Sequence, residues 1–223
     1  PDYLSLEEAA TVPLTALTAM QSFELMDAKP GQTVFMSGGT GSLGAMAIPL
    51  AKSLGLTVAT NGNGENEERV RALGADIFID YKKQSYADVL SEVDLVLDTL
   101  GDRELPTEFK ILKEGGHLVS LRGMPNGRFA RRMGLPWYKR FLLSLAGRKY
   151  DAMAARKKQT YDFIFVHEDG AQLESIASLF PAERPLTASI DATFTLDQIN
   201  EALAKVRAGG SQGKTIVRIG DFQ

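Results

Sequence analysis

Three glycines, Gly39, Gly41 and Gly44, constrain the fold of this chain more strongly than any other feature of its sequence. They follow an apolar run at 34–36 and precede a stretch at 45–54 in which apolar residues recur at helical intervals. Strand, glycine turn and helix are the context in which the spacing G-x-G-x-x-G indicates dinucleotide binding. A glycine turn with a purely structural role is the alternative, and the flanking pattern favours the dinucleotide site.

Each part of the glycine turn has a physical reason to hold a pyrophosphate. The first glycine permits a tight turn, the second lets the backbone approach the phosphates, and the third lets helix and strand pack closely. The following helix adds unpaired N–H groups and the positive end of its dipole, and Ser42 is its expected N-cap. The predicted phosphate contacts are Gly39, Thr40, Gly41, Ser42, Leu43 and Gly44.

The rest of the chain alternates short apolar runs with helical segments. Continuous apolar runs predict strands covered on both faces, at 34–36, 57–60, 77–79, 94–98, 117–121 and 161–166. Helices are expected between them and after the last, over 65–73, 85–92, 104–112, 123–158 in part, and 169–180. This alternation predicts an α/β fold of Rossmann type, a doubly wound, mainly parallel six-stranded sheet with helices on both faces.

The two ends of the chain lie outside this alternation. A helix over 5–25 is expected to begin with Ser5 as its N-cap, and Pro13 is expected to divide it into two pieces. Beyond Pro185, the pattern predicts a strand at 189–194, a capped helix over 196–208 and a strand at 214–219.

Composition excludes several classes of protein. No apolar run reaches the ~18 residues that cross a bilayer, and the start of the chain lacks the features of a secretory signal. The chain has no cysteine and two histidines, His117 and His167, so a zinc site would need carboxylate ligands. We therefore expect a cytoplasmic protein without a bound metal.

The net charge of −3 conceals a strongly basic segment. Residues 122–158 hold eleven Lys or Arg residues and one acidic residue, Asp151. Such a segment can bind nucleic acid, an anionic membrane or phosphates, or it can be a solvated helical face. The solvated face is favoured, and nucleic acid is the least expected partner because the chain is acidic as a whole and contains no known nucleic-acid-binding module.

Several motifs, taken in order, resemble those of the medium-chain dehydrogenase/reductase superfamily. They are E-A-A-T-V-P at 8–13, S-G-G-T-G-S-L-G at 37–44, L-G-A-D at 73–76, D-T-L-G at 98–101, G-G-H-L-V at 115–119 and G-K-T-I-V at 213–217. The chain is most similar to the zinc-independent quinone oxidoreductases, which are alcohol dehydrogenase-like, and to their NADPH-dependent enone reductase relatives. This implies hydride transfer between NADPH and a quinone, enone or carbonyl/alcohol substrate, and the alternative is a nucleotide-binding or interaction module without catalytic activity.

The resemblance also implies a division into parts. Members of the superfamily carry a GroES-like domain ahead of the cofactor domain, and this chain begins where that domain would end. Residues 1–30 would then be a helical lead-in, and 31–185 the dinucleotide-binding domain with a basic helical insertion at 123–158. Residues 186–223 would pack on the absent domain, so this portion alone is expected to be inactive. Whether that domain is naturally absent is left open.

The end of the second predicted strand distinguishes NAD from NADP. Asn61 stands where a carboxylate would bind the ribose 2′-hydroxyl of NAD, so NADP is favoured. Relatives often place Arg or Lys in this loop, where this chain has Glu65; Arg69 or Lys82 could compensate, although each is more readily a solvated charge. By resemblance Tyr81 lies near the adenosine, and an ordinary aromatic residue at a strand end is the alternative.

Residues after later strands complete the predicted cofactor site, because ligands bind at the carboxyl edge of an open parallel sheet. By resemblance they line the cofactor, and the last two meet the nicotinamide through their backbone: Leu100, Ser120, Leu121, Arg122, Gly123, Phe165 and Val166. For Phe165 and Val166, a place in the core of the edge strand is the alternative. No catalytic acid, base or nucleophile is identified, in keeping with catalysis by holding nicotinamide and substrate together.

Two predicted surfaces concern partners other than the small-molecule substrate. By resemblance, Trp137, Tyr138, Phe141 and Leu142 form an apolar wall near the substrate entrance, with a membrane-surface helix as the less favoured alternative. The sixth strand, 161–166, is an edge strand whose unpaired backbone groups invite pairing. The resemblance therefore predicts a homodimer through this edge.

Overall fold

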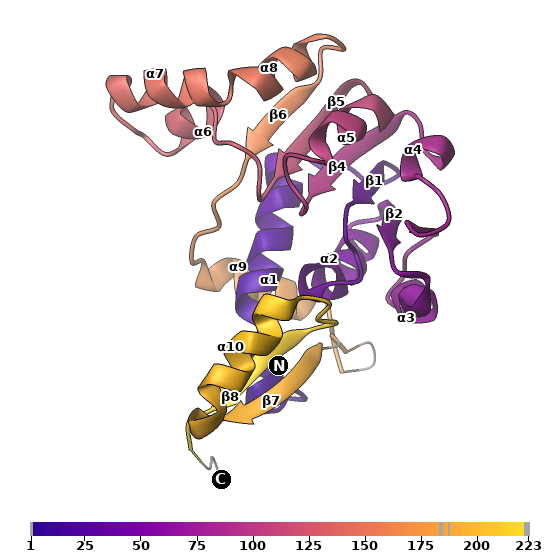
Figure 1. Ribbon diagram of the computed structural model, residues 1–223, viewed down its shortest axis with the longest axis vertical. Helices are drawn as coiled ribbons and strands as arrows, with labels where there is room; N and C mark the ends of the chain where they lie inside the picture. Colours follow the sequence, from indigo (N-terminus) through magenta and orange to yellow (C-terminus); the bar gives the residue numbers. More distant parts are fainter. Residues whose placement is uncertain (1, 183–184, 187, 221–223) are drawn as a thin grey trace.

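A six-stranded parallel sheet forms the centre of the molecule, with strand order β3-β2-β1-β4-β5-β6 (Figure 1). The computed structural model describes residues 2–182, 185–186 and 188–220. This strand order is the Rossmann order, so the predicted fold class is confirmed. The strands are β1 (Thr33–Met36), β2 (Thr57–Gly62), β3 (Ile77–Asp80), β4 (Val93–Asp98), β5 (Leu112–Ser120) and β6 (Thr160–Phe163).

Helices cover both faces of the sheet and divide the core into two apolar clusters. Within β1, Val34 and Met36 belong to one cluster and Phe35 to the other, because successive side chains point to opposite faces of a strand. The first cluster includes side chains of α1 (Leu6–Leu25), α2 (Ser42–Ser53), α3 (Glu67–Ala72) and α9 (Gly170–Ser178). The second includes side chains of α4 (Tyr86–Val89), α5 (Leu105–Ile111) and α8 (Arg148–Ala155).

Helix α1 is continuous, so the predicted division at Pro13 is wrong. The predicted cap at Ser5 is present as a capping box with Glu8, whose side chain accepts from the backbone N–H of Ser5 at 2.8 Å. A proline inside a helix removes one backbone hydrogen bond. Here the hydroxyl of Thr15 bonds to carbonyls on the same stretch, those of Thr11 and Val12, both at 3.1 Å. Packing of α1 into the first core cluster supplies the remaining stabilisation.

Some predicted element ends are displaced. Strand β5 begins at Leu112, directly after α5, where the pattern predicts the helix to end near Gly115 and Gly116. A register shift between the pairs Val93–Leu112 and Leu95–His117 places these two glycines in a bulge, which local pattern alone does not reveal. Strand β6 ends at Phe163 instead of residue 166. A 3₁₀ turn, η1 (Gly64–Asn66), precedes α3.

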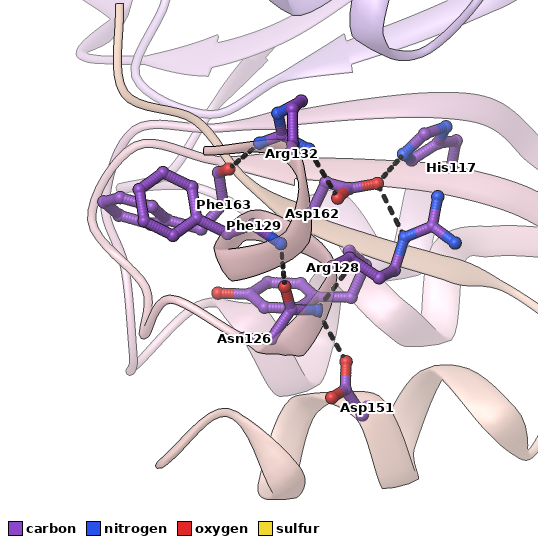
Figure 2. Close-up of polar contacts among 9 residues, drawn as sticks. His117, Asn126, Arg128, Phe129, Arg132, Asp151, Asp162 and Phe163 are labelled. Carbon is purple, nitrogen blue, oxygen red and sulfur yellow. Dashed lines mark hydrogen bonds and ion pairs between the residues drawn. The ribbon is translucent and has the colours of Figure 1, made fainter. Parts of the chain in front are cut away.

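The basic segment forms three helices between β5 and β6: α6 (Gly127–Arg132), α7 (Trp137–Ala146) and α8. Helix α6 is anchored to the sheet by Asp162 of β6, whose buried carboxylate contacts His117 Nε2 at 3.0 Å, Arg128 Nε at 3.1 Å and Arg132 Nη1 at 3.0 Å (Figure 2). A fully buried carboxylate is stable only with such compensation.

The end of the chain forms a separate two-stranded parallel sheet. It consists of β7 (Ile190–Thr195), η2 (Leu196–Gln198), α10 (Ile199–Ala208) and β8 (Lys214–Arg218). Figure 1 places this unit at the end of the long axis opposite α7. The last three residues of the predicted C-terminal part, 221–223, lie outside the described residues.

Candidate functional site

The glycine turn lies between the end of β1 and the start of α2, against β2. A Cβ at Gly39 would lie 2.1 Å from Thr60 Oγ1, and one at Gly44 would lie 2.1 Å from the carbonyl oxygen of Gly39. Both positions therefore exclude a side chain. At Gly41 the nearest atom is the carbonyl oxygen of Gly38, at 3.6 Å, so the protein itself leaves this position open. The left-handed backbone of the turn belongs to Gly38 (φ 70°), which precedes the motif.

Helix α2 presents unsatisfied amides at this turn. Its N-cap is Gly41, with extended backbone and no side-chain capping bond, so the prediction that Ser42 is the N-cap is wrong. Ser42 is instead the first helical residue. The amides of Ser42, Leu43 and Gly44 have no acceptor in the part of the chain that the structure describes. Three such donors at the positive end of a helix dipole form a ready anion site.

Two buried side chains of β2 accept hydrogen bonds from backbone amides of the glycine turn. Asn61 Oδ1 accepts from the amide of Gly38 at 2.8 Å, and Thr60 Oγ1 accepts from the amide of Gly39 at 3.0 Å. The Thr60 hydroxyl also donates to the carbonyl of Met36 at 2.7 Å. Asn61 therefore positions the glycine turn, a role the sequence did not indicate.

Arg69 lies against the glycine turn. Its Nη2 donates to the carbonyl of Thr40 at 2.6 Å, and its buried Nε has no hydrogen-bond partner within the described part of the chain. Burial lowers the pKa of the Arg69 guanidinium. The interpretation of Arg69 as a solvated charge is therefore wrong. The contact between Arg69 and the glycine turn depends on which face of α3 meets the turn. That face follows from the 3₁₀ turn η1 directly before α3, which the sequence pattern did not predict.

The other residues predicted near the adenosine lie at the ends of β2 and β3. Tyr81 is exposed, and its amide donates to the carbonyl of Gly62 at 3.2 Å. Glu65 is exposed and accepts from Asn63 Nδ2 at 2.9 Å, and Lys82 is also exposed. The amide of Lys82 donates to Asp80 at 3.0 Å and lowers the pKa of that carboxyl, and Lys83 pairs with the same carboxylate at 3.7 Å.

Asp98 organises the ends of β4 and β5. Its buried carboxylate accepts from the amides of Leu100 and Gly101, both at 2.8 Å, and from the hydroxyl of Ser120 at 2.5 Å. The Ser120 hydroxyl in turn accepts from the amide of Gly123 at 2.7 Å. Ser120 is therefore buried, and its hydroxyl links Asp98 to the loop that follows β5. Among the residues predicted here, Leu100 and Arg122 are exposed, Leu121 and Gly123 are half-buried, and they remain candidates for cofactor contact.

One buried acid beneath this edge was not singled out from the sequence. Glu108 of α5 is fully buried, and among the described residues neither of its carboxylate oxygens has a hydrogen-bond partner. Burial and the nearby charge of Asp98 raise the pKa of Glu108 well above its usual range. The sequence signal that could have indicated a buried acid is the position of Glu108 between apolar residues of a predicted helix.

Phe165 and Val166 follow the end of β6 and line a groove of about 710 Å³. The groove is bounded by α1, α6 and residues 164–168, and no residue of the glycine turn lines it. Phe165 is 66% exposed, so its alternative role in the core of the edge strand is wrong. Its predicted contact with the nicotinamide stays a prediction.

The described residues include no group of three His, Cys, Asp or Glu side chains able to hold a metal ion. Within the same residues, no helix has the length and apolar character needed to span a membrane. The expectation of a protein without metal stays a prediction.

The fold is that of a Rossmann-type domain, and comparison with known proteins identifies its family. Residues 73–217 match the family of zinc-binding dehydrogenases. A 2-methylene-furan-3-one reductase of Solanum lycopersicum is 36% identical over 126 residues, which are 55% of this chain and 32% of that protein. A chloroplastic NADPH-dependent alkenal/one oxidoreductase of Arabidopsis thaliana is 34% identical over 125 residues, again 55% of this chain and 32% of that protein.

Structural similarity extends over nearly the whole chain. The quinone oxidoreductase from Coxiella burnetii superposes with a TM-score of 0.80 at 25% identity, covering 97% of this chain and 62% of that one. The chain belongs to the zinc-binding dehydrogenase family, within the medium-chain dehydrogenase/reductase superfamily that its motifs predict. It spans about a third of the two plant relatives and less than two thirds of the Coxiella protein.

Proposed function

We propose that this chain is the cofactor-binding part of an NAD(P)H-dependent oxidoreductase that reduces a quinone, enone or carbonyl substrate. The observation that carries the proposal is the set of three unpaired amides at the start of α2, beside the open position at Gly41. These amides would hold the pyrophosphate. The Arabidopsis relative is named for NADPH-dependent reduction of alkenals and enones, which supports this substrate class.

The bound nicotinamide supplies a hydride, and the protein binds and orients it. The turn residues 39–44 hold the phosphates, while Leu100, Leu121, Arg122 and Gly123 would line the rest of the cofactor. Exposed Arg122 can pair with a phosphate because it has no ion-pair partner among the described side chains. With few protein groups in the chemistry, rate acceleration comes from proximity and orientation.

The substrate pocket needs a further part of the protein. The C-terminal unit exposes Leu203, Val206 and Ile219, which are 58%, 57% and 75% exposed. An upstream GroES-like domain that packs on these residues would bury them and complete the pocket. We therefore propose that the 223-residue chain binds cofactor but does not reduce substrate alone. The cytoplasmic location expected from the sequence stays a prediction.

Titration of the chain with NADPH and with NADH tests the proposal directly. We expect NADPH fluorescence to rise and shift on binding, because the nicotinamide leaves water. Binding of neither dinucleotide would contradict the whole assignment. Fusing the upstream domain and assaying enones and quinones then tests catalysis, and binding without turnover would favour the non-catalytic module.

Arg69 is proposed as the cation that favours NADP. The variant Arg69→Gln is expected to weaken NADPH binding by about tenfold and NADH binding by less than threefold, because only NADPH carries the 2′-phosphate. Lys82→Gln is the matched control, since Lys82 is exposed in the same region. Equal weakening of both dinucleotides by Arg69→Gln would instead assign Arg69 to support of the turn through Thr40.

The predicted homodimer through the edge of β6 meets an obstacle in the structure. The amide of Ile164 donates to Ser120 of β5, so Tyr161 and Phe163 direct their backbone groups to the open side of β6. Their carbonyls already accept from Asn126 Nδ2 at 3.0 Å and Arg132 Nη2 at 2.5 Å. We therefore expect light scattering at micromolar concentration to give the mass of a monomer. A dimer mass in the parent chain that is lost in the variant Phe163→Pro would instead support the dimer through the edge of β6.

A further inference from the structure

Helix α7 turns its apolar face to solvent. Trp137, Phe141 and Leu145 follow one another at intervals of one helical turn, and Tyr138 and Leu142 lie beside them, so all five share one face. Trp137 is 79% exposed, Phe141 60% and Leu142 59%. No residue of α7 is buried. A helix in a globular protein normally buries such a face, and a patch of this kind marks an interaction site.

The opposite side of α7 holds it on the protein. A Cβ at Gly127 of α6 would lie 2.3 Å from Ser144 Oγ, so α6 and α7 pack closely there. Leu143, on the same side, is half-buried. The four side chains expected from the sequence to form a substrate wall line no part of the groove beside Phe165. The apolar face is thus on the side of α7 away from its contact with α6.

Unpaired positive charge lies on α7 and on the two helices next to it in the chain. Four exposed cations on α6, α7 and the start of α8 have no ion-pair partner among the described side chains: Arg131, Lys139, Arg148 and Lys149. The one acidic residue of the segment, Asp151, is engaged by Asn126 Nδ2 at 2.7 Å. An occupant of this surface should therefore combine an apolar interior with negative charge.

A second copy of the chain does not fit this surface well. A two-fold contact through α7 would bring the same unpaired cations together on both sides, which is unfavourable. Pairing of β6 with its copy, the other route to a dimer near α7, is opposed by the side chains of Asn126 and Arg132 on its open carbonyls (Figure 2). The C-terminal unit lies at the far end of the long axis and does not cover α7 (Figure 1).

We propose that α7 binds the surface of a bilayer that contains anionic phospholipids. Its apolar face enters the boundary between headgroups and acyl chains, where Trp137 and Tyr138 suit an environment that is apolar at one end and wet at the other. The surrounding Lys and Arg residues contact the lipid phosphates. Each signal alone binds a membrane weakly, and the two together give stable but reversible attachment. The proposal is independent of cofactor binding.

Trp137 is the sole tryptophan of the chain, so its fluorescence reports on this surface without labelling. Added vesicles of phosphatidylcholine and phosphatidylserine are expected to shift its emission to shorter wavelength, and brominated lipids to quench it. Sodium chloride should reverse both effects, because the attraction to anionic lipid is screened. Vesicles of phosphatidylcholine alone should produce little change. Absence of a shift with saturating anionic vesicles would overturn the proposal.

Paired variants separate this surface from general exposure of apolar residues. The double substitution Phe141→Ser/Leu142→Ser keeps the reporter and is expected to lower vesicle affinity at least about tenfold. Leu203→Ser/Val206→Ser on α10 is the matched control, since these residues are 58% and 57% exposed, and it should bind like the parent chain. Equal loss in both variants would contradict the assignment to α7. A shift that depends on protein concentration without lipid would overturn it in favour of self-association.

Discussion

Replacing Gly41 by aspartate is expected to lower NADPH affinity by at least about a hundredfold while slightly stabilising the fold. Gly41 is the N-cap of α2, with φ −83° and ψ −179°, a conformation that any residue adopts. An aspartate there can accept from the amides that follow it, a favourable capping arrangement. The same carboxylate would occupy the amides proposed for the pyrophosphate and repel its charge. Stability and binding should therefore change in opposite directions.

Two controls make this prediction specific. Gly170→Asp places the same charge at the start of α9, where the added Cβ meets nothing within 4 Å, and should leave NADPH affinity unchanged. Gly44→Ala should instead destabilise the chain by about 1–3 kcal/mol, because its Cβ would strike the backbone of Gly39. Fluorescence titration and urea unfolding measure both quantities. Unchanged NADPH affinity in Gly41→Asp would remove the α2 amides from the cofactor site.

The second large effect is expected at Asp162, the anchor of α6. Asp162→Ala should lower the free energy of unfolding by about 3 kcal/mol at neutral pH, the low end for breaking a buried ion pair. The value is low because Arg128 and Arg132, with side chains 52% and 35% exposed, can turn toward water. Glu114→Gln, at an acid 65% exposed, is the control and should change stability little. Equal stability of Asp162→Ala and the parent would show that the insertion does not depend on this anchor.

The effect of Asp162 should also depend on pH. Burial raises the pKa of this carboxyl, but the hydrogen bond with His117 and the charge of Arg128 outweigh burial, and the net pKa is lowered. A carboxyl with a lowered folded pKa stabilises the protein above its unfolded pKa of about 3.9. That stabilisation is lost as the pH falls through the folded value. Urea unfolding of the parent chain and Asp162→Asn should therefore differ at pH above about 5 and converge in stronger acid.

Much of the fold was predictable because it depends on local pattern. Apolar runs, glycines and the cap at Ser5 located the strands, the turn and the start of α1, since periodicity and capping act within a few residues. The errors arose where tertiary contacts override local preference. Packing keeps α1 continuous through Pro13, and strand pairing carries β5 back to Leu112.

The candidate site divides in the same way. The sequence by itself determined the position of the glycine turn, the absence of a carboxylate at Asn61 and the family to which the chain belongs. Only the tertiary structure decided that Asn61 supports the turn, that Arg69 lies against Thr40, and that α7 faces outward. These features depend on which residues distant in sequence meet, and on which face of a helix meets the sheet. Spacing along one chain does not specify either, because both depend on how all the elements pack together.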